Sequence, residues 1–277
     1  MKLNAHAKIN LGLHVVGKRN DGFHDIETVF HRLALHDVIT IEPHGTLEVS
    51  ASNPEIPSQQ DNLCWKAAAL LQRELHCTEG VRIHITKNIP AGAGLGGGSS
   101  DAAAVLKNTP PLWNKEIDPR RLQALALELG SDVPFFLTDS SAYAGGRGEK
   151  LSYFPLPLPY WIVVVYPNIH VATPWAYKAL SEKRNGIFPV RDSITSLFPH
   201  PSIDALLSIG NDFEEVVFDR YPEIARVKTS LLHFGAARAL MSGSGSSVFG
   251  LFEHKTDAGA ASDEFSKKYF THITEPN

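Results

Sequence analysis

The chain has 277 residues, of which 43% are apolar and 20% charged, and its formal net charge is −4. This composition is that of an ordinary folded protein, with one large domain or two smaller ones sharing a cleft, and it argues against a disordered chain. Because Lys and Arg form no long run, it also argues against a nucleic-acid-binding or membrane-surface protein, while leaving room for a small basic pocket that takes an anionic ligand.

The two cysteines, Cys64 and Cys77, lack the partnered Cys and His spacing of a disulfide framework or a zinc site. The longest apolar run, at residues 161–166, is far shorter than the roughly 20 residues of a membrane span. The N-terminus has no apolar signal segment. We therefore expect a protein of the reducing cytoplasm without a membrane partner, and the sequence carries no signature of its oligomeric state.

In the first half of the chain, alternation of apolar and polar residues over 5–16 predicts a half-buried strand with Lys8 and Asn10 on its polar face. A turn at residues 20–22 precedes a further strand at 38–41. Asp61 or Asn62 can cap a helix over 64–75, and residues 81–85 alternate as another strand.

That strand leads through Pro90 into a loop with five glycines at 92–98, and Ser99-Ser100-Asp101 then reads as the capped start of a helix. A helix over 120–129 is expected to end at Gly130. Further along, the sequence predicts a buried strand at 161–166, a long surface connection at 184–203, a helix at 222–234 and a strand at 248–252. Helices and strands mix without a regular βαβ rhythm, which favours an α+β fold. Prolines at 155, 157 and 159 indicate a division into domains of residues 1–155 and 156–277.

The glycine loop matches several templates in part. Gly92, Gly94 and Gly97 satisfy the dinucleotide-binding pattern, but no βαβ unit precedes them, and no Gly-Lys-Ser/Thr ends the loop as in a Walker motif. A flexible glycine linker is the other alternative. Glycines between a strand and a helix N-terminus allow backbone N–H groups to approach a polyphosphate closely, and the hydroxyls of Ser99 and Ser100 can bond phosphate or cap the helix. A triphosphate is therefore the expected ligand.

Residues 90–103, Pro-Ala-Gly-Ala-Gly-Leu-Gly-Gly-Gly-Ser-Ser-Asp-Ala-Ala, resemble the phosphate loop of the GHMP small-molecule kinases. The segments 7–11, 129–134 and 241–246 resemble that family's other motifs in the same order, and 17–24 is similar to the substrate-binding turn of its branch that acts on a cytidine diphosphate-linked acceptor. The resemblance implies an α+β, two-domain GHMP-kinase fold with the active site in the cleft between an ATP-binding N-terminal domain and a substrate-side C-terminal domain. It implies that ATP is bound at Pro90, Ala91, Gly92, Ala93, Gly94, Leu95, Gly96, Gly97, Gly98, Ser99 and Ser100.

The same resemblance assigns the chemistry to Asp132 and Lys8. A carboxylate can accept the hydroxyl proton late in a dissociative phosphoryl transfer, and an ammonium can stabilise the growing negative charge. On the residues alone, Asp132 reads more simply as a turn residue and Lys8 as a solvated lysine on a strand. Asn62, Leu63 and Lys87 fall where the family contacts adenine and ribose, although Asn62 reads equally well as a helix cap. Mg²⁺ is expected to accompany ATP, and no protein ligand is assigned to it.

At the acceptor end, the resemblance implies a cytosine held between two aromatic rings, at Phe23 and Tyr177, with His24 reading the edge of the base. Phe23 stands where the family usually has Tyr, an exchange that keeps the stacking surface. The resemblance also implies that Thr173 and Pro174 bind the acceptor, and Asn10, which shares the polar face of its strand with Lys8, is expected to contact acceptor hydroxyls. The alternative for Phe23 and Tyr177 is that both are ordinary core aromatics.

The implied reaction is transfer of the γ-phosphate of ATP to the 2-hydroxyl of a cytidine diphosphate-linked methylerythritol, a step of non-mevalonate isoprenoid synthesis. A second hypothesis is another kinase of the family, acting on homoserine, mevalonate or a sugar, acceptors without a base to stack on Phe23 and Tyr177. A nucleotide-binding protein that has lost catalysis is a third, disfavoured because Lys8 and Asp132 are both present. A dinucleotide-dependent oxidoreductase lacks its βαβ frame.

Overall fold

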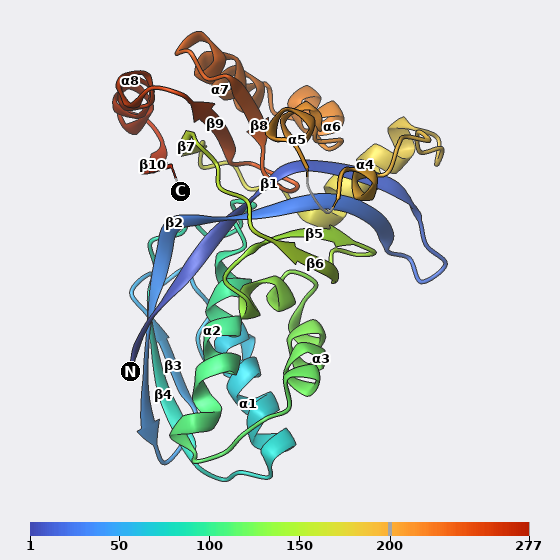
Figure 1. Cartoon of the computed structure of the whole chain (residues 1–277). Coiled ribbons are helices and arrows are strands. Elements are labelled where there is room, and N and C mark those ends of the chain that lie inside the picture. Colours follow the sequence, from blue (N-terminus) through green and yellow to red (C-terminus); the bar gives the residue numbers. More distant parts are fainter. Residues whose placement is uncertain (199–200, 277) are drawn as a thin grey trace. The chain divides into compact units, whose positions relative to one another are not determined.

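The computed structural model describes residues 1–198 and 201–276 (Figure 1). Helices combine with mostly antiparallel strands, so the predicted α+β class is confirmed. The chain forms two compact units: unit 1 comprises Met1–Ala7, Leu35–Ala91 and Gly96–Asp139, and unit 2 comprises Lys8–Ala34, Gly92–Leu95 and Ser140–Asn277. Two long strands, β1 (Lys2–Lys18) and β2 (His24–His44), contribute residues to both units. The expected domains of residues 1–155 and 156–277 stay a prediction.

Unit 1 packs helices against its part of a six-stranded sheet (Figure 1). Its further elements are β3 (Glu48–Ala51), η1 (Gln59–Asp61), α1 (Leu63–Leu75), β4 (Gly80–Thr86), α2 (Gly97–Leu112), α3 (Pro119–Leu129) and η2 (Val133–Leu137). Strand β4 pairs antiparallel with the end of β2 and parallel with β3. Along β4 the buried residues Val81, Ile83 and Ile85 alternate with exposed ones, as the sequence predicts. They share one apolar core with α1 and α2.

The helix starts in unit 1 follow from local chemistry, with one correction. Asn62 caps α1 by accepting a hydrogen bond from the Cys64 N–H at 2.8 Å, as predicted. The expectation that serines cap α2 is wrong, because α2 already begins at Gly97 and its N-cap is Gly96. Gly96 has φ 72°, a left-handed conformation that glycine adopts without a steric penalty. Ser99 and Ser100 therefore lie within the first turn.

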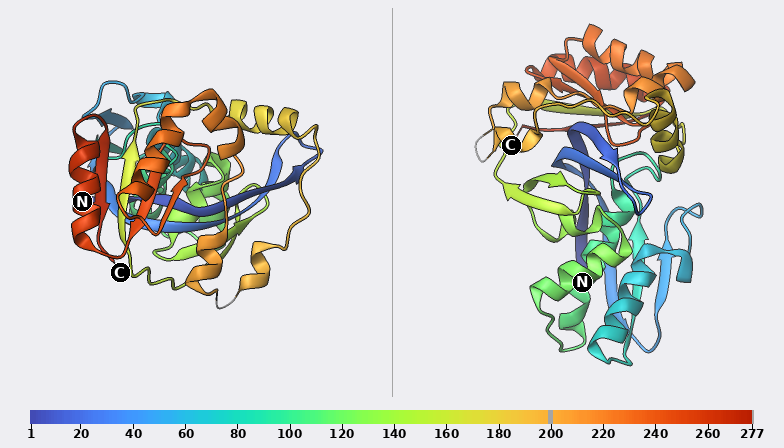
Figure 2. Two further views of the ribbon diagram at one scale, coloured as in Figure 1. Left: turned by 90° about the horizontal axis from the view of Figure 1, so that it is seen from above. Right: turned by 90° about the vertical axis from the view of Figure 1, so that its right-hand side faces the viewer.

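Unit 2 contains a second sheet whose strands run in the order β10-β7-β9-β8, all antiparallel. Its further elements are β5 (Ser141–Gly145), β6 (Lys150–Phe154), β7 (Trp161–Tyr166), α4 (Thr173–Lys183), η3 (Ile194–Leu197), α5 (Ile203–Ser208), α6 (Glu214–Arg220), α7 (Pro222–His233), β8 (Arg238–Met241), β9 (Val248–Phe252), α8 (Lys255–Ser266) and β10 (Phe270–Thr274). Helices α7 and α8 cover one face of this sheet (Figure 2). The predicted strands at 161–166 and 248–252 and the helix at 222–234 are confirmed, the helix ending one residue early.

Strand β1 differs from the half-buried strand that its alternation predicts. Ala7, Ile9 and Leu11 are buried as expected, but Lys8 and Asn10 on the other face are only 4% and 1% exposed. The reading of Lys8 as a solvated lysine is therefore wrong. Local alternation shows which residues differ in polarity, and it cannot show that a second layer covers the polar side.

The segment between α4 and α5 is only partly the surface connection that its composition predicts. Val190 is fully exposed, but the segment contains the 3₁₀ turn η3, and Ile194 at its start is buried. Ser193 and the backbone of Ile194 both donate hydrogen bonds to the carboxylate of Glu27 on β2, at 2.6 Å each. Residues 199–200 of this segment lie outside the described residues.

In the described part of the chain, no helix is long and apolar enough to cross a membrane. Cys64 and Cys77 are both buried and unpaired. Burial raises the pKa of the Cys64 thiol well above its usual range, which keeps this group protonated at neutral pH.

Unit 2 contains a buried histidine that links stability to pH. His31 on β2 is 3% exposed, and its Nδ1 lies 2.9 Å from the Ser141 hydroxyl. Burial lowers the pKa of His31 from 6.5 to about 4. Between these values the unfolded chain binds the proton more readily, so the contribution of neutral His31 is complete above pH 6.5 and is lost as the pH falls towards 4.

In the wild type, His31 should lower the free energy of unfolding by up to about 3 kcal/mol as the pH falls from 7 to 4. We expect this part of the pH dependence to be absent in His31→Gln. Urea unfolding at a series of pH values measures the free energy of unfolding of both proteins. His84→Gln, at an exposed position of β4, is the matched control. Identical pH slopes for the wild type and His31→Gln would contradict the assignment.

Candidate active site

The glycine loop is a backbone structure that only glycine can form. Gly92, Gly94 and Gly96 have φ values of 64°, 80° and 72°. A Cβ on Gly94 would lie 2.4 Å from the carbonyl oxygen of Ser242, which is too close for any other residue. The loop therefore exposes backbone where the resemblance predicts a phosphate ligand.

In unit 2, three hydrogen bonds fix residues 93–95 of this loop. The backbone N–H of Lys8 donates to the Leu95 carbonyl at 2.9 Å, and that of Ser247 donates to the Ala93 carbonyl at 3.1 Å. The Ser242 hydroxyl donates to the Gly94 carbonyl at 3.0 Å. The predicted phosphate loop is thus tied to the strand that carries Lys8 and to the serine-glycine turn near residue 242.

Lys8 and Asn10 form one buried polar row in unit 2. The Lys8 ammonium donates to Asn10 Oδ1 at 2.7 Å and lies 4.9 Å from the centroid of the Phe30 ring. Asn10 Nδ2 donates to the Thr28 hydroxyl at 2.8 Å, which donates in turn to the Gly12 carbonyl at 2.5 Å. The row holds a positive charge in a fixed position, which suits a group that must meet a phosphoryl oxygen.

In unit 1, Lys87 lies between two acidic side chains that no sequence motif assigned to the site. Its ammonium bonds the carboxylates of Asp37 and Asp101, and the Lys87 side chain is only 6% exposed. Asp37 also accepts the backbone N–H groups of Asn88 and Ile89, at 2.6 and 2.8 Å, and so fixes the chain that enters the loop. A Cβ on Gly97 would lie 3.2 Å from the Lys87 nitrogen, so this cluster lies directly beneath the first residue of α2.

Burial is the largest influence on the pKa values of Asp101 and Lys87 in the cluster of Asp37, Lys87 and Asp101. It raises the pKa of Asp101 to about 7, with Lys87 opposing the shift and Asp37 adding to it. Burial alone would lower the pKa of Lys87, but the two carboxylates raise it instead. Asp101 Oδ1 has no hydrogen-bond partner among the described residues. An acid directly after Ser99-Ser100 was the available sequence signal for Asp101, whereas Asp37 carries none.

Unit 1 also contains Asn62 and Leu63, which are predicted on the ATP side, and Asp132, the predicted base. Asn62 caps α1, and its Nδ2 donates to the Pro57 carbonyl at 2.7 Å, so capping accounts for its visible contacts. A Cβ on Gly98 would be 3.7 Å from Leu63 Cδ1, which places Leu63 beside the start of α2. Asp132 directly precedes η2, with φ −83° and ψ −19°. Asp132 thus belongs to unit 1 and Lys8 to unit 2.

The predicted base-binding residues meet in unit 2, though not in the expected pairing. The His24 ring stacks on the Tyr177 ring, with centroids 4.8 Å apart and planes 19° apart. Phe23 is 52% exposed, and its ring is covered by the Arg147 guanidinium at 4.6 Å from the centroid. His24 Nε2 is buried and has no hydrogen-bond partner among the described residues. Burial, with Lys18 adding to it, lowers the pKa of His24, so the ring is neutral at pH 7.

Helix α4 positions the remaining acceptor-side residues. Thr173 and Pro174 form its first turn, and Tyr177 follows one turn later on the same helix. The Thr173 hydroxyl lies 2.8 Å from that of Ser244, which connects α4 to the serine-glycine turn that also holds Gly94. Unit 2 thus joins Lys8, Asn10 and the base-binding residues through one set of local contacts.

Two family models match the chain. "GHMP kinases N terminal domain" matches residues 62–140, and "GHMP kinases C terminal" matches residues 199–271. The 4-diphosphocytidyl-2-C-methyl-D-erythritol kinase of Chlorobium chlorochromatii (strain CaD3) is 43% identical, covering 99% of this chain and 96% of that protein. The enzyme of the same name from Chloroherpeton thalassium is 38% identical, covering 98% and 96%.

Among solved structures, a 4-(cytidine 5'-diphospho)-2C-methyl-D-erythritol kinase is similar with a TM-score of 0.83 and 36% identity, covering 99% of this chain and 98% of that one. The homoserine kinase from Cytophaga hutchinsonii gives a TM-score of 0.67 at 17% identity, covering 98% and 95%, and shares the fold alone. The chain belongs to the 4-diphosphocytidyl-2-C-methyl-D-erythritol kinase family of the GHMP kinases, and is an ATP-dependent small-molecule kinase.

Proposed function

We propose that the protein transfers the γ-phosphate of ATP to the 2-hydroxyl of 4-(cytidine 5'-diphospho)-2-C-methyl-D-erythritol, in the cytoplasm, as a step of non-mevalonate isoprenoid precursor synthesis. The observation that supports this choice of acceptor is the stack of His24 on Tyr177. The Nε2 atom of His24 is buried there and has no hydrogen-bond partner among the described residues. A ring nitrogen of a neutral imidazole can donate or accept a hydrogen bond, depending on the tautomer, and can therefore bond the polar edge of a cytosine. Homoserine, mevalonate and simple sugars have no nucleobase that could make this contact.

In the proposed acceptor site, His24 reads the edge of the base, while Phe23 and Tyr177 supply aromatic surface. The half-exposed ring of Phe23 supports this, because the group that lies over it is the flexible side chain of Arg147, which a base could displace. Asn10, Thr173 and Pro174 are proposed to contact the rest of the acceptor. Each lies in unit 2 with the base-binding residues.

In the proposed chemistry, Asp132 accepts the proton of the acceptor hydroxyl, and Lys8 stabilises negative charge on the transferred group. The burial of Lys8 supports its role, because a charge in a site of low dielectric acts more strongly than one in water. The hydrogen bond from Lys8 to Asn10 fixes the ammonium before substrate arrives, so that little reorganisation is needed in the transition state.

The residues of the loop fit an ATP polyphosphate. Three glycines have left-handed backbones, and the first N–H groups of α2 have no partners within the helix. Residues 90–100 are therefore proposed to bind the phosphates, with Asn62, Leu63 and Lys87 towards adenine and ribose. The described residues contain no group of three or more His, Cys, Asp or Glu side chains placed to hold a metal, so Mg²⁺ is proposed to bind through the phosphates and water.

The test is a coupled ADP-release assay with ATP and magnesium on four acceptors: the cytidylated methylerythritol, mevalonate, homoserine and galactose. We expect turnover on the cytidylated acceptor alone. Turnover on another acceptor would keep the kinase assignment and refute the base-binding site. An absence of turnover on all four would favour a nucleotide-binding protein that has lost catalysis.

A further inference from the structure

Phe188 is an aromatic residue with no assigned role, and it lies against the residue that is proposed to read the base. It belongs to the segment that follows α4, and its ring meets the His24 ring edge-on, with centroids 5.8 Å apart and planes 74° apart. The neighbouring apolar side chains Ile187 and Val190 are exposed, whereas Phe188 packs partly buried against the core of unit 2. Only one of the three therefore turns towards the base-binding residues.

Phe188 ends a row of four rings. Phe213, which is buried, meets Tyr177 at an interplanar angle of 89° and a centroid distance of 4.8 Å. Tyr177 stacks on His24, and His24 meets Phe188. The stacked ring of Tyr177 opposes rotation of the His24 imidazole about its Cβ–Cγ bond, and the edge-on ring of Phe188 limits its movement from the other side. Together they aim the unpartnered Nε2 in one direction.

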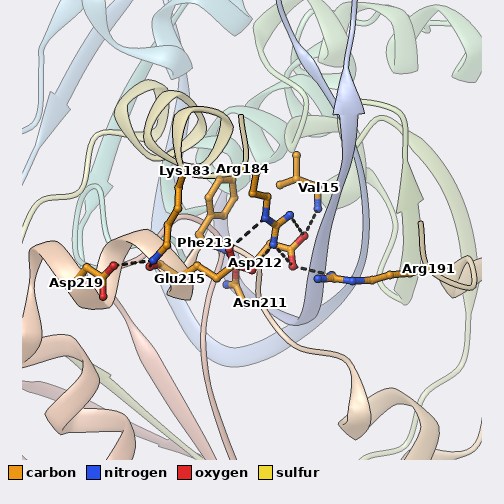
Figure 3. Close-up of polar contacts among 9 residues, drawn as sticks. All are labelled: Val15, Lys183, Arg184, Arg191, Asn211, Asp212, Phe213, Glu215 and Asp219. Carbon is orange, nitrogen blue, oxygen red and sulfur yellow. Dashed lines mark hydrogen bonds and ion pairs between the residues drawn. The ribbon is translucent and has the colours of Figure 1, made fainter. Parts of the chain in front are cut away.

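Ion pairs hold the segment that carries Phe188 on both sides. Figure 3 shows the Asp212 carboxylate between Arg184, Arg191 and the backbone of Val15. Arg184 Nη1 donates to Asp212 at 3.1 Å and Arg191 Nη1 at 2.6 Å, while the Val15 N–H donates at 2.8 Å. Phe188 lies between the two arginines in the sequence, so its backbone is fixed from both ends.

Glu27 gives the segment a second attachment, two and three residues beyond Arg191. Its carboxylate accepts the hydroxyl of Ser193 and the N–H of Ile194 at 2.6 Å each. Glu27 lies on β2 three residues after His24. The same strand that carries the base reader therefore anchors the segment that carries Phe188, so the two rings keep a constant relation.

We infer that Phe188 is a positioning residue for His24, and that the segment anchored by Asp212 and Glu27 thereby sets the preference for cytosine. This inference rests on the proposed function, because it assumes that His24 reads a cytosine. Without the Phe188 ring, the imidazole loses one of the two neighbouring rings that restrict it, and its hydrogen bond to the base loses part of its fixed direction. The preference for cytosine over uracil, which present different donors and acceptors, then weakens.

The experiment compares steady-state kinetics of the wild type with Phe188→Ala, Phe188→Leu and Phe188→Tyr. Loss of the ring in the Ala and Leu variants is expected to raise the KM for the cytidylated acceptor about tenfold, with the KM for ATP and kcat within about twofold. The preference for the cytidine acceptor over its uridine counterpart is expected to fall by a similar factor. Phe188→Tyr keeps the ring and is expected to behave as the wild type, and Val190→Ala is the exposed control in the same segment.

The outcomes separate this inference from the proposed function. Wild-type turnover of the cytidylated acceptor, combined with an unchanged KM and base preference in Phe188→Leu, overturns the role of Phe188 and leaves the proposed function standing. A uniform fall of kcat with both KM values unchanged also overturns it, since that is the effect of a general structural defect. If the wild type does not turn over the cytidylated acceptor, the proposed function falls and this inference falls with it.

Discussion

Asp132→Asn is expected to lower kcat by about 10²- to 10⁴-fold while ATP affinity changes less than twofold, the range typical of a lost general base. The amide has nearly the shape of the carboxylate but cannot accept the hydroxyl proton. Because Asp132 occupies a single αR position before η2, the substitution places no demand on the backbone that Asn cannot meet. The ADP-release assay gives kcat, and calorimetric titration with ATP gives the affinity.

Asp118→Asn provides the control for this substitution. Asp118 is exposed in the same unit and caps α3 by accepting the Arg120 N–H at 2.8 Å, a function that Asn also performs. Its kcat should equal that of the wild type. Turnover of Asp132→Asn at more than about a tenth of the wild-type rate would exclude Asp132 as the base.

Lys87→Met is expected to reduce the free energy of unfolding by about 3–5 kcal/mol at pH 7, the usual effect of removing one partner from a buried ion pair. The substitution leaves Asp37 and Asp101 buried without the ammonium that lies between them. Two carboxylates in that position repel each other, so protonation of one relieves part of the cost. The deficit should therefore shrink as the pH is lowered from 7 to 5.

Urea unfolding of Lys87→Met beside Lys66→Met tests this expectation. Lys66 is exposed on α1 in the same unit, and its replacement should change the free energy of unfolding by less than about 0.5 kcal/mol. A loss below about 1 kcal/mol in Lys87→Met, or a deficit that grows on acidification, would contradict the charge cluster. In the wild type, the pH dependence of stability due to Asp101 has the opposite sign to that due to His31. The raised pKa of Asp101 means that the folded state binds the proton more readily than the unfolded chain, so this group adds to the free energy of unfolding as the pH falls through 7.

Local sequence rules predicted the elements whose determinants are local. The alternation in β4 and the Asn62 cap of α1 need only neighbouring residues, and both predictions are confirmed. The serine cap of α2 failed because Gly96 adopts a left-handed conformation and starts the helix before the serines. The sequence shows which side chains can cap a helix, but the backbone conformation of the whole glycine loop decides at which residue the helix begins.

The parts of the candidate site that escaped prediction depend on distant residues. Lys8 is buried by a layer that its own strand cannot reveal, and Lys87 bonds Asp37 from fifty positions earlier. Phe188 reaches His24 only because Asp212 and Glu27 hold its segment. The predicted residue types Lys8, Asp132, His24 and Tyr177 came from recognised motifs, and their roles stay predictions.

The division of the chain into interleaved units has a consequence for biosynthesis. Unit 1 ends at Asp139, so all its residues have been synthesised when half the protein is made. Unit 2 includes Lys8–Ala34, whose partners include the Asp212 N–H, which donates to the Leu13 carbonyl at 2.9 Å, and the Ser242 hydroxyl. This early segment must therefore wait for some two hundred further residues, which at 5–20 residues per second takes about 10–40 s. The apolar side chains of this segment that are buried in the folded protein stay exposed during that interval, and slowing translation should prolong their exposure without delaying unit 1.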